Sequence, residues 1–172
     1  VGWYRLRFEA PAFTSSDKAT LIFDGAMSHA KVYLNGHEIG YWPYGYNSFY
    51  LDATPYMKPG ESNLLAVRLE NETESSRWYP GAGLYRNVHL VVTEDAHIPT
   101  WGTQLTTPVV KDDYAKVNIK TTLVVPSGKQ FDAYRIVTEL KDKDGKVVTT
   151  DEKQGSRFDD NIFSQELVVS RP

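Results

Sequence analysis

The sequence predicts an all-β protein built from two small β-rich domains, and three observations carry that prediction. Short segments of alternating apolar and polar residues recur along the 172 residues, separated by turns rich in Gly, Pro, Asn and Asp. Aromatic residues reach 13% of the chain, with 11 Tyr and 4 Trp, a content that favours strands. No segment shows a convincing helical period, so helices are not expected to build the core.

The first domain is predicted to be a series of short strands. Asn35-Gly36 lies between two of them and is typical of a tight hairpin, because a type I′ turn needs positive φ at both central residues. The segment 63–69 is apolar enough to suggest a strand buried on both faces. The expected strands are residues 3–8, 19–23, 30–34, 37–40, 48–51, 63–69 and 86–92.

Residues 70–83 interrupt this pattern with a long polar and aromatic loop between two confident strands. Loops of this length inside small domains are usually functional or disordered. A domain boundary is expected at about residues 95–100, where the pattern breaks again. The strands expected beyond it are residues 116–125, 134–141, 147–154 and 162–169, with Asp144-Gly145 as a turn. Short strands at this spacing favour a sandwich.

The composition excludes several classes of function. The net charge is −3 and the 19 basic residues are scattered, so neither nucleic acid nor an anionic membrane is an expected partner. The absence of Cys excludes disulfides, thiolate metal sites and cysteine nucleophiles. The four His residues are far apart and form no metal-ligand spacing, so neither a metal nor another cofactor is expected.

Three motifs in order resemble glycoside hydrolase family 2, and in particular its β-galactosidases. They are Gly2-Trp3-Tyr4-Arg5, residues 32–40 (VYLNGHEIG) and residues 77–88 (RWYPGAGLYRNV). The resemblance implies a jelly-roll sugar-binding domain over residues 1–96, without its N-terminal strands. It also implies an immunoglobulin-like β-sandwich over residues 97–172, without its C-terminal end.

The same resemblance implies that the chain is not catalytic by itself. The family carries its two catalytic Glu residues on a downstream (β/α)8 barrel, and no βα alternation occurs here. The implied role is to support the missing barrel and to help shape its pocket for β-galactosides or related β-glycosides. Apolar surface left by the barrel would favour self-association, and an oligomer is therefore a further expectation.

Arg77 and Trp78 are the candidate substrate-binding residues that the resemblance implies. A guanidinium can donate to sugar hydroxyls, and an indole face can stack on a sugar ring. The alternative is that Trp78 packs an interface and that Arg77 pairs with a carboxylate. Glu72, Glu74 and Ser76 are further candidates for the same pocket.

A second hypothesis from a different class is a free-standing carbohydrate-binding module. It rests on Trp42, Tyr44 and Tyr46, which could form a stacking platform, although packing on the sandwich or against the missing barrel is the favoured interpretation. Gly81 and Gly83 are expected to serve backbone geometry. Arg86 is expected to hold a carboxylate or a loop carbonyl.

Overall fold

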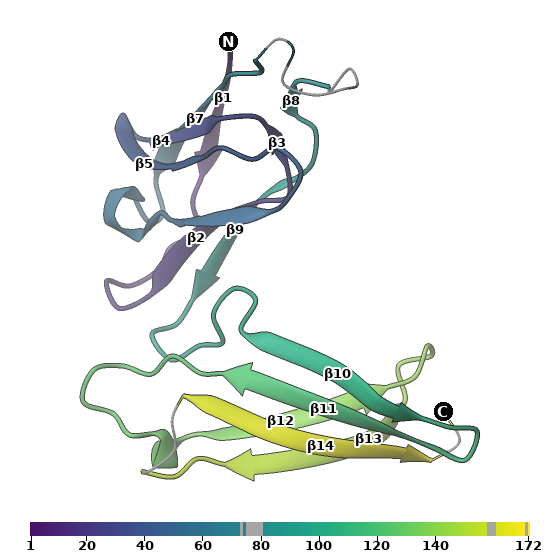
Figure 1. The fold of residues 1–172 in the computed structure, drawn as a ribbon. Coiled ribbons are helices and arrows are strands. Elements are labelled where there is room, and N and C mark those ends of the chain that lie inside the picture. Colours follow the sequence, from purple (N-terminus) through teal and green to yellow (C-terminus); the bar gives the residue numbers. More distant parts are fainter. Residues whose placement is uncertain (73, 75–80, 158–160, 171) are drawn as a thin grey trace. The chain divides into compact units, whose positions relative to one another are not determined.

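Strands dominate the computed structural model of the chain, which describes residues 1–72, 74, 81–157, 161–170 and 172. Two short 3-10 helices are the helical elements of this described part, and no helix in it is long and apolar enough to cross a membrane. The predicted all-β class is therefore confirmed. The chain divides into two units, Val1–Glu94 and Asp95–Pro172 (Figure 1).

Unit 1 is a sandwich of two antiparallel sheets. Its strands are β1 (Gly2–Glu9), β2 (Lys18–Phe23), β3 (Ala26–Met27), β4 (Ala30–Leu34), β5 (His37–Trp42), β6 (Phe49–Asp52), β7 (Ser62–Leu69), β8 (Gly83–Leu84) and β9 (Val88–Thr93). One sheet has the order β1-β7-β4-β5 and the other β6-β2-β9, while β3 and β8 form a short pair of their own. The 3-10 helix η1 (Thr54–Tyr56) lies between β6 and β7.

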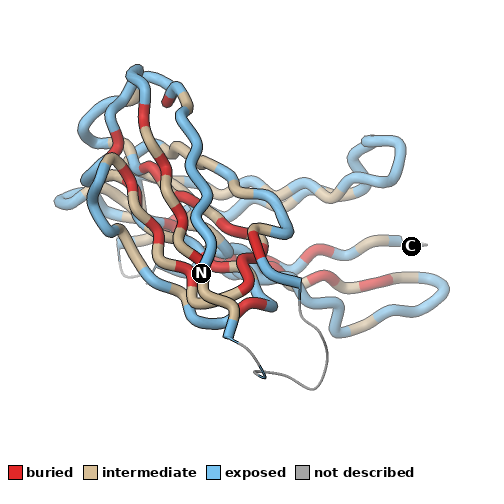
Figure 2. The backbone as a smooth tube through the Cα atoms, turned by 90° about the horizontal axis from the view of Figure 1, so that it is seen from above, coloured by how far each residue is buried: buried red, intermediate tan, exposed pale blue. Residues whose placement is uncertain are grey.

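The core of unit 1 lies between these sheets and follows the two-residue period of the strands. Buried residues alternate with residues of intermediate burial along β2, β4 and β7, as the alternation of red and tan in Figure 2 illustrates. Val32 and Val67 face inward from one sheet and Phe23 from the other, where Phe23 stacks on Phe49 with ring centroids 4.8 Å apart. The prediction that β7 is buried on both faces is wrong. One face is buried and the other is half-exposed, because the outer face of its sheet is not covered.

The β4–β5 hairpin forms as its sequence predicts. Asn35 and Gly36 take φ values of 51° and 90°, which is the left-handed conformation that this turn requires. The Asn35 side chain also ties the turn to β7, since its Nδ2 donates to the Oδ1 of buried Asn63 at 2.8 Å and its Oδ1 accepts from the Leu64 N–H at 2.9 Å.

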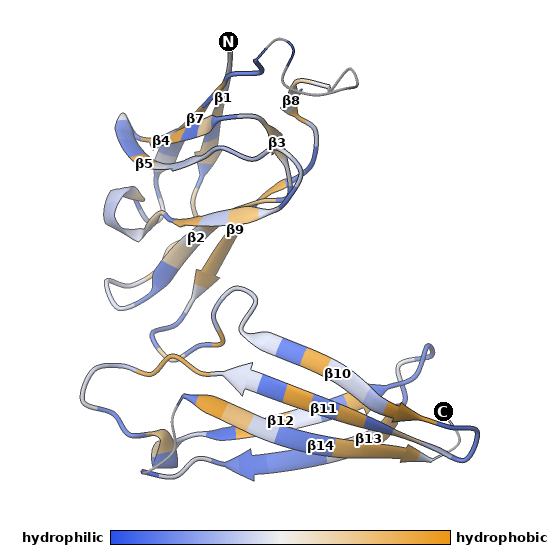
Figure 3. Ribbon diagram, viewed as in Figure 1, coloured by the Kyte–Doolittle hydropathy of each residue, from blue (hydrophilic) through white to orange (hydrophobic). Residues whose placement is uncertain are grey.

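Unit 2 contains a three-stranded sheet, β10-β11-β14, and a two-stranded sheet, β12-β13. The strands are β10 (Thr103–Val110), β11 (Tyr114–Thr122), β12 (Arg135–Lys141), β13 (Val147–Gln154) and β14 (Ile162–Ser170), with the 3-10 helix η2 (Phe131–Ala133) before β12. Hydrophobic and polar residues alternate along β11 (Figure 3), and buried and exposed residues alternate along β14. Gln165 links the sheets, accepting from Thr138 Oγ1 at 2.8 Å and donating to the Asp151 carbonyl at 3.1 Å.

Three strands were not predicted from the sequence. β10 is polar and almost wholly exposed, and its pairing with β11 shifts register between Thr106 and Val109, on either side of Pro108. Proline cannot donate to a ladder and is confined to edge strands or bulges. The other two, β3 and β8, have two residues each and carry no periodic signal.

Candidate functional site

The loop that carries the sequence candidates begins and ends beside the same short segment of unit 1. Met27 of β3 pairs with Gly83 of β8, at the end of the loop. In the next residue, Ser28, Oγ donates to the Glu70 carbonyl at 2.8 Å, and the carbonyl oxygen accepts from the Glu70 N–H at 2.9 Å. The start and the end of the loop are therefore both tied to residues 27–28.

Arg77, Trp78 and Ser76 lie outside the described residues. The structure describes the two ends of their loop, which lie at Glu70 and at the β3–β8 pair. Glu72, at the start of the loop, lies 3.8 Å from His29, measured from Oε1 to Nε2. The substrate-binding role of Arg77 and Trp78 stays a prediction.

The two loop glycines serve different purposes. Gly83 has a φ of 120°, and a Cβ there would meet the Tyr4 hydroxyl. The prediction that backbone geometry requires a glycine at position 83 is therefore confirmed. Gly81 has no such φ, and a Cβ there would meet no atom of the described residues within 4 Å, so for Gly81 the described part of the chain gives no corresponding reason for a glycine.

A polar pocket of about 650 Å³ opens beside the start of the loop. An ion pair holds one side of it, with Arg68 Nη2 2.8 Å from Glu70 Oε2, and this hydrogen bond lowers the pKa of Glu70. On another side the Nδ1 of His29 lies 2.6 Å from the Tyr41 hydroxyl. The polar pocket is lined by His29, Lys31, Glu38, Tyr41, Arg68, Glu70 and Glu72.

The aromatic cluster of the second hypothesis is split by the structure. Trp42 packs as predicted, stacked on Phe49 with centroids 5.6 Å apart, and its Nε1 donates to Asn47 at 2.9 Å. Tyr44 and Tyr46 instead remain 56% and 45% exposed and meet edge to face at 5.6 Å. Both tyrosines lie on the loop after β5 and outside the core of unit 1. Packing against the catalytic barrel, the other partner that the packing interpretation allows, stays a prediction.

Tyr85 and Arg86 continue the chain from β8. The Tyr85 hydroxyl donates to the Gly45 carbonyl at 2.7 Å. This bond ties the segment to the loop that carries Tyr44 and Tyr46, called the tyrosine loop below. The Arg86 guanidinium lies over the Tyr85 ring, 5.5 Å from its centroid. Arg86 is exposed, and among the described residues its partner is this ring; the carboxylate or carbonyl partner that the sequence suggested stays a prediction.

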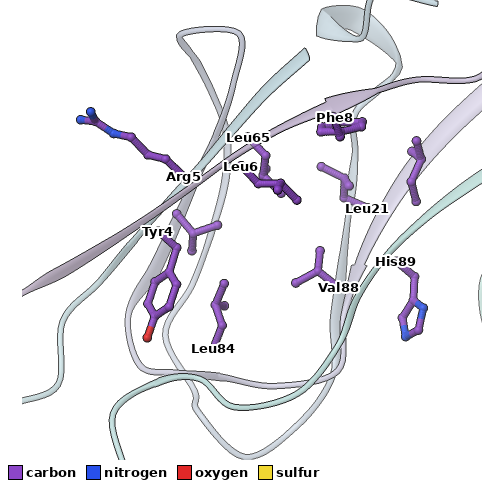
Figure 4. Close-up of a pocket in the computed structure, with 11 residues that line it drawn as sticks. Tyr4, Arg5, Leu6, Phe8, Leu21, Leu65, Leu84, Val88 and His89 are labelled. Atoms are coloured by element: carbon purple, nitrogen blue, oxygen red, sulfur yellow. The ribbon is translucent and has the colours of Figure 1, made fainter. Parts of the chain in front are cut away.

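An apolar groove of about 340 Å³ opens on unit 1 between β1 and β9 (Figure 4). Leu6 and Phe8 reach it from β1, and Val88 and Leu90 from β9. The Arg5 side chain points away from the groove in Figure 4. Such a lining offers few partners for hydroxyl groups, so it differs in kind from the polar pocket.

The histidines of the described residues have ordinary partners. His89 Nε2 lies 2.9 Å from Asp24 Oδ2, and His37 stacks on Tyr56 with centroids 4.6 Å apart. Within the described part of the chain, no three His, Asp or Glu side chains gather in a way that could hold a metal ion.

A comparison with known protein families decides the identity. The family described as "Glycosyl hydrolases family 2, sugar binding domain" matches residues 1–94, which coincide with unit 1. The chain belongs to glycoside hydrolase family 2. The resemblance seen in the three sequence motifs is thereby confirmed.

Relatives within family 2 align with both units. A β-galactosidase of Bacteroides ovatus is 39% identical over 175 residues, covering 100% of this chain and 20% of its own length. A β-galactosidase of Thermoanaerobacter pseudethanolicus is 32% identical, covering 90% of this chain and 22% of its own length. A β-glucuronidase of Formosa agariphila is 28% identical, covering 88% of the chain and 17% of its length.

Solved structures of the family share the fold. A family 2 glycosyl hydrolase from Bacteroides cellulosilyticus superposes with a TM-score of 0.86 and 32% identity, over 99% of this chain and 22% of the other. The chain thus spans about a fifth of the length of the relatives that it matches.

Proposed function

We propose that this chain is the non-catalytic N-terminal portion of a retaining family 2 glycoside hydrolase that acts on β-galactosides or related β-glycosides. The match of the family's sugar-binding domain to residues 1–94, in a chain that spans a fifth of its relatives, carries this proposal. Residues 1–96 would be a jelly-roll sugar-binding domain and residues 97–172 an immunoglobulin-like sandwich. Together they would support the catalytic barrel and shape its substrate pocket.

The carboxylates of the polar pocket are poorly suited to catalysis. Retaining hydrolysis needs two carboxyl groups about 5–5.5 Å apart, one of them a general acid with a raised pKa. Glu70 instead has a lowered pKa, because Arg68 donates a hydrogen bond to it. Glu72 lies beside His29 on the chain that leads into the loop, without a strand to fix it against a second carboxyl.

The loop between Glu72 and Gly81 is the part proposed to reach the substrate. Its two ends are held by β3, β8 and the Ser28–Glu70 hydrogen bonds. Arg77 would donate to sugar hydroxyls and Trp78 would stack on a sugar ring, as their chemistry allows.

Kinetics of the longer enzyme that carries this chain test the pocket-shaping role. Arg77→Ala and Trp78→Ala should each raise KM for a nitrophenyl β-galactoside by about three- to tenfold, the loss of one stacking contact or hydrogen bond. Lys143→Ala, in an exposed turn of unit 2, is the matched control and should leave KM unchanged. If both loop variants keep the parental KM, the loop does not shape the pocket.

A free-standing carbohydrate-binding module is the second candidate, and the exposed pair of Tyr44 and Tyr46 is the observation that favours it. Calorimetry of the chain against galactose, cellobiose, xylan and mannan tests it. Heat that Tyr44→Ala abolishes would support this candidate, while an absence of heat with all four sugars would eliminate it.

A further inference from the structure

The outer face of the four-stranded sheet in unit 1 carries two rows of side chains that the strand register brings together. The first row crosses all four strands, with Trp3 opposite Arg68, Arg68 opposite Lys31 and Lys31 opposite Tyr41. The second row has Arg5, Ala66, Tyr33 and Glu38, in the same strand order. Residues from positions 3 to 68 therefore share one surface.

An aromatic pair stands at the β1 side of this face. Trp3 is 52% exposed, and its ring centroid lies 5.7 Å from that of Tyr33 with the planes tilted by 33°. The small Ala66 lies between their strands and leaves room for the two rings to meet. The Arg5 guanidinium lies over the indole, 6.0 Å from the ring centroid, so a sugar ring that stacks on Trp3 through its C–H groups would also meet the donors of Arg5.

Polar groups of both signs fill the β4 and β5 side, within the polar pocket. Lys31 Nζ has no ion-pair partner among the described residues, so its donors are available to a ligand. The Glu38 carboxylate lies beside the Tyr33 hydroxyl and has acceptor capacity for a ligand. Burial and the neighbouring Glu38 raise the pKa of Tyr33. Arg68 is held in place by Glu70.

The charge balance of the pocket selects the class of ligand. Two cations, Lys31 and Arg68, face three carboxylates, so a ligand with a full charge of either sign would meet groups of its own sign. A neutral hydroxyl can both donate and accept, and it therefore suits the Lys31 donors and the Glu38 acceptor together.

We propose that this outer face, from Trp3 across to the polar pocket, binds a neutral oligosaccharide. One sugar ring would lie on Trp3 and Tyr33, and the hydroxyls of a neighbouring ring would contact Lys31 and Glu38. Neighbouring strands are about 4.8 Å apart, so Trp3 and Lys31 lie roughly 10 Å from each other across β7 and a single ring does not span them. Only the ligand class, carbohydrate, rests on the proposed function; Arg77 and Trp78 take no part in this site.

Titration of the full chain with defined sugars tests the proposal. The probes are the neutral β-1,4-galactotetraose and cellotetraose and the acidic tetragalacturonate. Binding of each probe is measured by calorimetry and by changes in the amide chemical shifts of the chain. At least one neutral tetrasaccharide should bind at millimolar concentration or better, should shift amides of β4 and β5, and should bind more tightly than the acidic probe.

Three variants locate the site. Trp3→Ala should weaken binding by about tenfold through loss of the stacking face, and Lys31→Met by about three- to tenfold through loss of a charged donor. Lys143→Ala, in the exposed turn of unit 2, is the control and should leave the affinity unchanged. Tyr44→Ala is the contrast that separates this face from the second candidate site. Circular dichroism checks each fold, and Trp3→Phe, which keeps an aromatic ring, replaces Trp3→Ala if that variant unfolds.

The proposal is overturned if neither neutral probe binds, if the acidic probe binds more tightly, or if affinity is lost with Tyr44→Ala but kept with Trp3→Ala and Lys31→Met. It is also overturned if Arg77→Ala abolishes the binding, which would move the ligand to the loop. Failure here leaves the KM result for the loop variants intact, so the two proposals are tested separately.

Discussion

The apolar groove and the polar pocket lie on the same sandwich and differ in what their walls contribute. The groove is walled by core residues such as Leu21 and Val67, which are 2% and 1% exposed. The pocket is walled by charged side chains on the outer face of the sheet, of which Lys31 and Arg68 are half-buried. Changes in the groove should therefore alter folding, whereas changes in the pocket should alter ligand contacts.

The largest effect on the free energy of unfolding is expected from a substitution in the apolar groove. Leu21→Ala should lower the free energy of unfolding by about 2–5 kcal/mol, because a buried leucine is replaced by a cavity. Lys31→Ala, in the pocket, is the matched comparison and should change it by less than about 0.5 kcal/mol, as for most surface positions. Urea denaturation measures both. Equal losses would mean that the pocket is as structural as the groove.

The next effect concerns the end of the loop. Gly83→Ala should destabilise unit 1 by about 1–3 kcal/mol, since a φ of 120° is strained for any residue with a Cβ. Gly81→Ala has open space and no such φ, and it should be neutral within about 0.5 kcal/mol. Thermal melts of the two variants decide between them, and identical melting temperatures would refute the distinct role assigned to Gly83.

A third prediction concerns association. Leu6 is 59% exposed at the rim of the groove and lies on an edge strand, β1, two features that favour contacts between molecules. The purified chain should self-associate at high concentration, and Leu6→Lys should reduce the average mass measured by light scattering. A parent chain that stays monomeric at high concentration contradicts this prediction.

The smallest effect is a pH dependence in the pocket. The pKa of Glu70 is lowered in the folded chain by the hydrogen bond from Arg68, so its contribution is complete above the ordinary value of 4.5 and is lost as the pH falls through the lowered pKa. Glu70→Gln removes this dependence. The gap in melting temperature between parent and variant should therefore close on acidification, and a constant gap would show that the ion pair does not contribute.

Features that depend only on residues close together in the sequence were predictable. The Asn35-Gly36 turn depends only on local backbone preference, and β4 and β13 have the bounds that their alternation predicted. β10 was not predictable, because its polar residues and Pro108 give no strand period and only pairing with β11 keeps it extended.

The polar pocket was beyond sequence analysis for a different reason. Tyr41, Lys31 and Arg68 come side by side only through the register of β5, β4 and β7, and no local pattern contains that register. Glu72 was the one pocket residue that the sequence had singled out, through its place in the long loop. The substrate candidates came from a motif, and a motif supplies residue identities without their contacts.

The central claim is that this chain contacts carbohydrate without cleaving it, and an activity assay tests the second half most directly. The purified 172-residue chain, incubated with a nitrophenyl β-galactoside, should release nitrophenol at the rate of buffer alone, because the chain is proposed to lack the catalytic barrel and because the pKa of Glu70 in the polar pocket is lowered rather than raised as a general acid requires. Release above the buffer rate that persists through repurification of the chain would contradict the account.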